Sequence, residues 1–369
     1  MAVGTAGQVS FTANLPPDSY VMEPAAWSQA TERQDMPMPS VSVAKLGESS
    51  ELRLPQVGAV ALVRLRVHGT LKTKTFTTGS VTLLPGFPYN LGWKVALNYN
   101  GQTSIISCRG TVLRARRQRI FRNPKDELAV EPAIGALASN TAYPFTFVVD
   151  VPIAANMLNL AGIVLAQNPQ LQLTVDWTWP TEQQVVATTG EGGIAEFSAT
   201  IEPELTTFAV GNVMVGKEQK LLLPNLTVAH GLIDNTYPIT GPGVVEAPLI
   251  RTSGQLLDYA FNVNNANVAQ IAPTALSEIS WIYGGNRTPR QYKPPHQLLE
   301  SNQDNYNGLI VVGGLNYTYL DFEVDNPARD LYIPEGLVEL ATRLEIPSSV
   351  EVKQGAYLHY VQESLYPVT

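Results

Sequence analysis

The sequence predicts an all-β protein made of two β-sandwich units in tandem, with a few short helices. From about residue 52 onward, short runs rich in Val, Leu, Ile, Thr and aromatic residues are interrupted by Gly, Pro or Asn about every eight to twelve residues, which is the spacing typical of sandwich strands and their turns. A length of 369 residues allows two such units, and a weak internal repeat favours them.

Alternation and turn residues predict the individual strands. In residues 59–67 alternation places three apolar side chains on one face and two arginines on the other. These are Val63, Leu65 and Val67, opposite Arg64 and Arg66. Asn100-Gly101 stands between two strand-like runs and predicts a hairpin. Further strands are expected at 145–149, 170–177, 317–324 and 349–360.

Helical patterns are scarce, and we expect short helices only at 154–167 and 335–344, with a third near 294–301. The first two follow similar segments, Val149-Asp150-Val151-Pro152 and Val324-Asp325-Asn326-Pro327. This order of elements favours a duplicated unit, as does the likeness of Leu52-Arg53-Leu54-Pro55 to Leu221-Leu222-Leu223-Pro224. The alternative is that Asp and Pro are simply common where a strand ends, because Pro cannot stay in a central strand and Asp favours turns.

Residues 1–50 predict an N-terminal arm. They are rich in proline, for example at Pro16-Pro17 and Pro24, and they lack a periodic pattern. Tyr20, Met22 and Trp27 nevertheless supply apolar anchors. We therefore expect the arm to pack either against a neighbouring subunit or along the same one.

Composition excludes several function classes. The chain has 24 Lys and Arg against 32 Asp and Glu, a net charge of −8, which argues against a surface built for direct, sequence-specific nucleic-acid binding. Charged residues make up only 15% of the chain, well below the usual share of about 25%, so the surface is suited to being covered. The single cysteine, Cys108, cannot form an intramolecular disulfide. We expect neither a signal peptide nor a membrane-spanning segment.

No constellation typical of catalysis is present in the sequence. The four histidines are isolated from one another and form no metal-binding pair. They are His68, His230, His296 and His359. The glycine-rich run 190–193 lacks the lysine and helix of a phosphate loop, and no Gly-x-Ser-x-Gly elbow occurs. We therefore predict no catalytic, cofactor-binding or metal-binding residues, no cofactor and no enzymatic activity.

One basic cluster stands out in this acidic chain. Alternation within it predicts one exposed strand face. The candidate residues are Arg114, Arg116, Arg117, Arg119 and Arg122, and Arg109 lies just before them. One interpretation is an anion-facing patch for nucleic acid or the headgroups of an internal membrane. The other, slightly favoured, is a subunit interface in which the guanidinium groups pair with acids of a neighbour.

The sequence resembles the tectivirus-type double jelly-roll major capsid proteins of membrane-containing icosahedral bacteriophages. The resemblance rests on three segments: residues 159–169 leading into the strand 171–177, Ser280-Trp281-Ile282-Tyr283-Gly284-Gly285-Asn286, and the C-terminal stretch 317–366. It covers about the last two thirds of the chain. It implies two tandem jelly rolls, at residues 51–205 and 206–369, after the arm.

The resemblance also implies a structural role. Three chains would form a pseudo-hexameric homotrimer, and many trimers would tile an icosahedral virion shell over an internal membrane, after assembly in the host cytoplasm. Its partners would be neighbouring trimers, penton and minor capsid proteins, and the membrane.

The sequence leaves two other interpretations of the function open. A carbohydrate-binding or spike-like β protein could use Trp177, Trp179 and Trp281 as sugar platforms. A two-domain cupin enzyme is less favoured, because it needs histidines and a glutamate clustered on its strands.

Overall fold

The computed structural model describes residues 19–101, 103–120, 130–157, 160–226, 228–248, 255–266, 279–283, 288–292, 309–321, 340–346 and 352–367. These residues are mostly β-strand, as the sequence predicts. The chain divides into two compact units. Unit 1 comprises residues 1–113, 126–231 and 365–369, and unit 2 comprises residues 114–125 and 232–364. The ranges 51–205 and 206–369 for the two jelly rolls stay a prediction.

Unit 1 is built from four groups of paired strands. The largest sheet has the order β10-β5-β14-β2, with β11 paired to β5 and β3 to β14. Opposite it lies the group β8-β7-β12-β4, and two smaller sheets have the orders β13-β6-β9 and β1-β16-β15. The strands are β1 (Ser19–Met22), β2 (Arg33–Pro37), β3 (Val41–Val43), β4 (Ser49–Arg53), β5 (Ala59–Thr73), β6 (Gly79–Leu83), β7 (Lys94–Tyr99), β8 (Thr103–Cys108), β9 (Ala136–Leu137), β10 (Ala142–Pro152), β11 (Val164–Leu165), β12 (Leu173–Thr178), β13 (Val186–Gly190), β14 (Ile194–Phe208), β15 (Asn212–Val215) and β16 (Glu218–Pro224).

Helices are short and few among the described residues. They are α1 (Pro24–Ala30), a 3₁₀ turn (Tyr89–Leu91), α3 (Glu182–Val185) and α2 (Gly110–Ile120), which begins in unit 1 and continues into unit 2. A capping box at Thr181 and Gln184 begins α3.

Unit 2 contains two groups of strands. One has the order β22-β23-β19-β25-β17 and the other the order β18-β24-β20-β21. The strands are β17 (Val228–Pro238), which starts in unit 1, β18 (Gly243–Pro248), β19 (Gln255–Ala266), β20 (Ile279–Tyr283), β21 (Thr288–Tyr292), β22 (Leu309–Val312), β23 (Leu315–Asp321), β24 (Leu340–Ile346) and β25 (Val352–Pro367).

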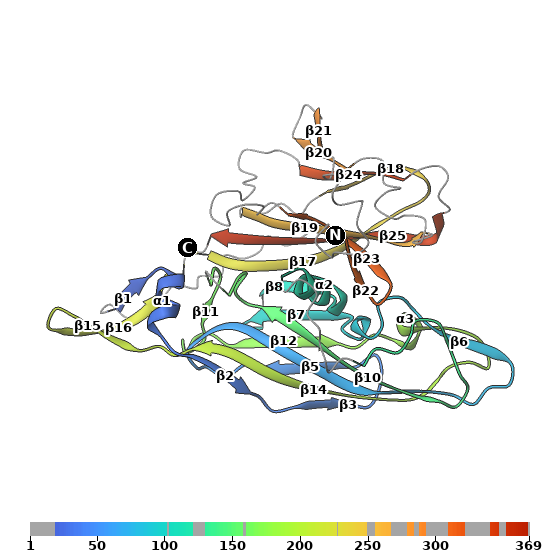
Figure 1. The fold of residues 1–369 in the computed structure, drawn as a ribbon, viewed down its shortest axis with the longest axis horizontal. Coiled ribbons are helices and arrows are strands. Elements are labelled where there is room, and N and C mark those ends of the chain that lie inside the picture. Colours follow the sequence, from blue (N-terminus) through green and yellow to red (C-terminus); the bar gives the residue numbers. More distant parts are fainter. Residues whose placement is uncertain are drawn as a thin grey trace. The chain divides into compact units, whose positions relative to one another are not determined.

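Aromatic side chains join the two layers of unit 1. Figure 1 shows β5, β10 and β14 in one layer and β7 and β12 in the other. The rings of Phe147 on β10 and Trp177 on β12 lie 6.4 Å apart between centroids, and those of Trp179 and Phe197 lie 5.6 Å apart. All four side chains are buried. Such pairs add to the stabilisation that burial of large rings already supplies.

The predicted strand and hairpin in unit 1 are confirmed. In β5 the apolar residues at 63, 65 and 67 are fully buried, whereas Arg64 and Arg66 lie on the solvent side. The hairpin between β7 and β8 turns at Asn100 and Gly101, which have φ values of 53° and 68°. Two positive φ values in succession define the hairpin turn that Asn-Gly favours.

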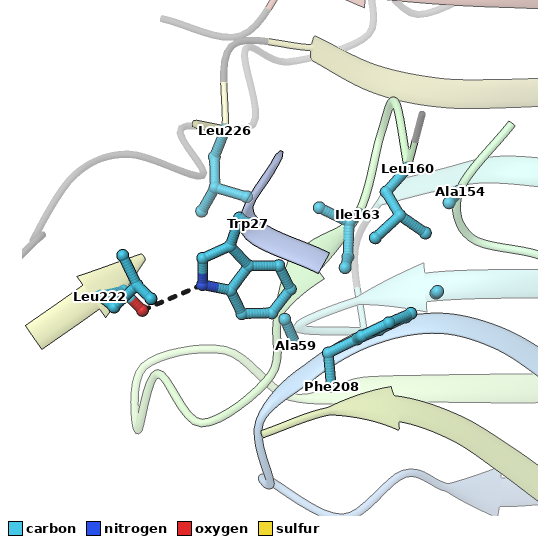
Figure 2. Packing of buried hydrophobic residues seen from close by; sticks show 9 residues of the cluster. Trp27, Ala59, Ala154, Leu160, Ile163, Phe208, Leu222 and Leu226 are labelled. Carbon is cyan, nitrogen blue, oxygen red and sulfur yellow. Dashed lines mark hydrogen bonds between the residues drawn. The ribbon is translucent and has the colours of Figure 1, made fainter. Parts of the chain in front are cut away.

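Residues 19–50 belong to the body of unit 1. Strand β1 pairs with β16, and β2 and β3 pair with β14. Trp27 of α1 is completely buried, and its indole Nε1 donates a hydrogen bond to the Leu222 carbonyl at 3.0 Å. Figure 2 shows the indole between Leu222, Ala59 and Phe208. Of the two placements predicted for the arm, these residues show packing within the same chain; residues 1–18 lie outside the described part.

Two predicted helices, at 154–167 and 335–344, are wrong wherever the structure describes their residues. The described residues of 154–167 form turns and the short strand β11, because Gly162 has a φ of +86° and a Cβ there would lie 2.6 Å from the Cβ of His230. Residues 340–344 belong to β24, which pairs with β18 and β20. Tertiary pairing here overrides the local pattern. The third predicted helix, at 294–301, lies outside the described residues.

One of the sequence matches that support the internal repeat has no counterpart in the strand order. The segments 52–55 and 221–224 look alike in sequence, but β4 lies beside β12, whereas β16 lies between β1 and β15. The two segments therefore do not hold equivalent positions. Residues 324–327, on which the other match rests, lie outside the described part of the chain.

Candidate assembly surface

The structure places the basic cluster on a helix, so the prediction of an exposed strand is wrong. Arg114, Arg116 and Arg117 lie on α2. The first two are buried and Arg117 is half-buried. Arg119 is on the same helix, and Arg122 lies outside the described residues. The run from 113 to 119 consists of Leu, Arg, Ala and Gln, which are good helix formers, so local propensity favours a helix over the strand that alternation suggests.

Arg116 has its partner within the chain. Its Nε and Nη2 lie 2.9 and 2.7 Å from Oε1 of Glu363 on β25, and the two side chains are only 9% and 5% exposed. Both residues belong to unit 2. Burying two charges costs free energy that their mutual attraction offsets only when the geometry is good. The pairing therefore holds α2 against β25, 247 residues away in sequence.

The arginines of the basic cluster therefore have different surroundings. Arg109, at the end of β8, lies with its guanidinium carbon 4.7 Å from the ring centre of Trp93, a cation–π contact. Arg116 is used inside unit 2. The interface or membrane role of Arg114, Arg116, Arg117, Arg119 and Arg122 stays a prediction.

A ladder of ion pairs covers the outer face of the large sheet in unit 1. It runs along β5, whose basic residues face acids on both neighbouring strands. The contacts are Arg64 Nε with Asp150 at 3.1 Å, Arg64 Nη1 with Glu204 at 3.5 Å, Arg66 Nη1 with Glu202 at 3.2 Å and Lys72 Nζ with Glu196 at 2.9 Å. Three basic residues pair with four acids on this face, so it carries little net charge and can be packed against another polar surface.

The ladder ends at β2, where Asp35 accepts a hydrogen bond from the Thr206 hydroxyl at 2.6 Å and pairs with Arg33 at 3.0 Å. Partial burial, the largest single effect, raises the pKa of Asp35, but the hydrogen bonds from Thr206 and Arg33 and the Arg33 charge together hold it below its usual range. Asp35 is therefore a carboxylate at neutral pH.

The residues considered for other functions are used in packing. Trp177 and Trp179 are completely buried and donate hydrogen bonds to the Leu91 carbonyl and the Ser50 hydroxyl. They therefore cannot form a sugar platform, and the side chain of Trp281 is outside the described part. His230 is buried with Nδ1 2.6 Å from the Pro152 carbonyl oxygen.

His359 Nε2 lies 2.9 Å from Asp234 Oδ2, and both residues belong to unit 2. No group of three or more His, Cys, Asp or Glu side chains in the described residues is arranged to hold a metal. In the same residues, no helix has the length and apolar character needed to span a membrane.

Comparison with known proteins finds similarity in structure alone. No family profile and no curated protein sequence matches the chain. Among solved structures, the STIV MCP matches with a TM-score of 0.63 at 14% identity, over 91% of this chain and 97% of that one. The chain from the Sulfolobus turreted icosahedral virus particle matches with a TM-score of 0.63 at 15% identity, over 91% of both.

A chain of the PBCV-1 virus capsid also matches, with a TM-score of 0.60 at 11% identity, over 91% of this chain and 93% of that one. At these identities the comparison establishes the fold and nothing finer. The predicted fold class is confirmed: the chain has the double jelly-roll fold found in viral major capsid proteins.

Proposed function

We propose that this chain is a structural major capsid protein of the tectivirus type, without enzymatic activity. The observation that carries the proposal is the match of its fold to capsid chains over more than nine tenths of its length. Because the likeness extends over both compact units, it supports the role of a whole capsid subunit rather than of one shared module.

In this proposal three chains form a pseudo-hexameric homotrimer, and trimers tile an icosahedral shell over an internal membrane. The polar ladder on β5, which carries little net charge, supports burial against neighbours, since interface rims are polar and hydrogen-bonded. The partners are neighbouring trimers, penton and minor capsid proteins and the internal membrane, with no direct sequence-specific nucleic-acid contact. In this proposal the protein is located in the virion shell, which is assembled in the host cytoplasm.

The mass of the purified chain tests the proposal. We expect a particle of three 40.1 kDa chains by sedimentation or light scattering, and shells or sheets of trimers by electron microscopy at high protein concentration. A chain that stays monomeric at every concentration would contradict the proposal. The burial of Trp177 and Trp179 removes the main support for the carbohydrate-binding alternative.

The arginine cluster is tested by a double variant, Arg117→Gln with Arg119→Gln, which leaves the Arg116–Glu363 pair in place. If the helix end faces an internal membrane, the variant should lose salt-sensitive binding to anionic vesicles, since each basic residue contributes about 1 kcal/mol there, and the trimer should survive. If it faces a neighbouring subunit, the trimer should weaken and vesicle binding should be weak from the start. We favour the second outcome.

A further inference from the structure

Strand β15 (Asn212–Val215) is an edge strand of unit 1 that carries none of the usual protection against pairing with another strand. Natural edge strands usually carry charges, prolines or bulges. Strand β2, at the edge of the large sheet, has Arg33, Asp35 and Pro37. Strand β15 has the sequence Asn-Val-Met-Val, and residues 208–216 contain no charge.

Four of the seven large hydrophobic side chains that are exposed among the described residues lie on the same small sheet. Met214 and Val215 on β15, and Tyr20 and Val21 on β1, are large hydrophobic residues with exposed fractions from 36% to 63%. Figure 1 shows the β15–β16 hairpin extending beyond α1 within unit 1. Exposed apolar groups that gather in one place mark a surface that another molecule covers.

The hydrogen-bond pattern shows which backbone groups face the open edge. The Leu222 N–H donates to the Gly211 carbonyl at 2.9 Å, and the register continues with Val213 opposite Lys220. In an antiparallel pair successive residues point to opposite sides, so Asn212 and Met214 direct their N–H and C=O groups away from β16. Among the described strands, β15 pairs with β16 alone.

We propose that β15 pairs antiparallel with β15 of a second copy of this chain, across a twofold axis near Val213. The strand suits its own copy, because an uncharged segment brings no like charges together when it pairs with itself. In this register Asn212 lies opposite Met214 of the second copy and the two exchange backbone hydrogen bonds. The contact is too small to hold two copies alone, but it gains strength when trimers present several such strands at once. The inference thus rests on the proposed function and assigns β15 to contacts between trimers.

Cross-linking tests the pairing directly. The native thiol, Cys108, is fully buried, so Met214→Cys introduces one accessible thiol. A short bis-maleimide should then join two chains at least ten-fold more efficiently than in a Val57→Cys control, which places a thiol at a similarly exposed apolar position of unit 1. Equal yields from the two variants would overturn the proposal.

Two further changes in the Met214→Cys background separate strand pairing from chance proximity. Asn212→Pro removes an N–H that the hairpin itself does not use, and it should abolish the cross-link while circular dichroism stays unchanged. Asn212→Lys keeps the N–H but charges the edge, and it should lower the yield in a salt-dependent way. A cross-link that survives both changes would contradict the pairing.

The mass of the same samples without the reagent distinguishes this inference from the proposed function. A trimer that shows no cross-link through position 214 overturns the β15 pairing and leaves the capsid role intact. A monomer that still cross-links through position 214 supports the pairing and contradicts the trimer.

Discussion

Two sets of ion pairs in this molecule use the same chemistry at opposite degrees of burial. In unit 2, Arg116 and Glu363 are both nearly inaccessible. In unit 1, Arg66 and Glu202 are each almost half exposed, and Arg64 with Asp150 lies between these extremes, with a buried carboxylate and a guanidinium that is 33% exposed. Water screens exposed charges, whereas a buried charge that loses its partner has no water to solvate it. Burial should therefore set the energetic importance of each pair.

The largest effect is expected from Arg116→Met. The change keeps most of the side-chain volume but removes the guanidinium from the buried Glu363 carboxylate, and breaking such a pair costs about 3–5 kcal/mol. Urea unfolding should show a matching loss of stability. The double variant Arg116→Met with Glu363→Leu is the control, and it should recover most of the loss, because no buried charge remains. A single-variant loss below about 1 kcal/mol would mean that water reaches the pair.

An intermediate effect is expected from Asp150→Asn. The amide fills the same space but gives up the charge that pairs with Arg64 at 3.1 Å, and a hydrogen bond to a charged group contributes about 1.5–3 kcal/mol. Glu204→Gln, on the exposed side of the same arginine, is the matched control and should cost less. If the two variants are equally destabilised in urea, burial of the carboxylate does not decide the energy.

The same contrast explains what the sequence could predict. The exposed basic face of β5 follows from alternation over neighbouring residues. The hairpin between β7 and β8 follows from the local backbone preference of Asn100-Gly101. The partner of Arg116 lies 247 residues away, so no local pattern shows that this arginine is buried. The acids that complete the ladder are likewise distant, since Arg66 and Glu202 are 136 positions apart in the sequence.

The prediction of secondary structure from sequence is wrong where tertiary contacts determine the local conformation. Residues 340–344 pair with two strands of unit 2, and the turn at Gly162 is set by its close approach to His230. Neither neighbour can be recognised from the local sequence. Helix α2 is different, because the helix-forming residues from 113 to 119 carried a usable signal.

A small effect is expected from Arg66→Gln. Both partners of the Arg66–Glu202 pair are almost half exposed, and exposed pairs contribute about 0–1 kcal/mol. The change in urea midpoint should shrink further in concentrated salt, because the Debye length falls to about 3 Å at 1 M. A loss as large as that of Arg116→Met would break the proposed link between burial and energy, and would point to a coupled network along β5.

The smallest effect is expected at Asp35, at the end of the ladder, and it should appear only as a change with pH. The folded state holds the pKa of Asp35 below its usual range, so the carboxylate stabilises the fold above the unfolded pKa of about 3.9, and this contribution is lost as the pH falls through the lower, folded pKa. Thr206→Val removes the hydroxyl that donates to Asp35, whereas Thr206→Ser keeps it. The difference in unfolding free energy between these two variants should therefore be larger at pH 7 than at pH 2, by less than about 0.5 kcal/mol, because Asp35 remains partly exposed and screened. If the difference is the same at both pH values, the hydroxyl stabilises only through packing and its neutral hydrogen bond, and the charge of Asp35 has no part in holding β2 to β14.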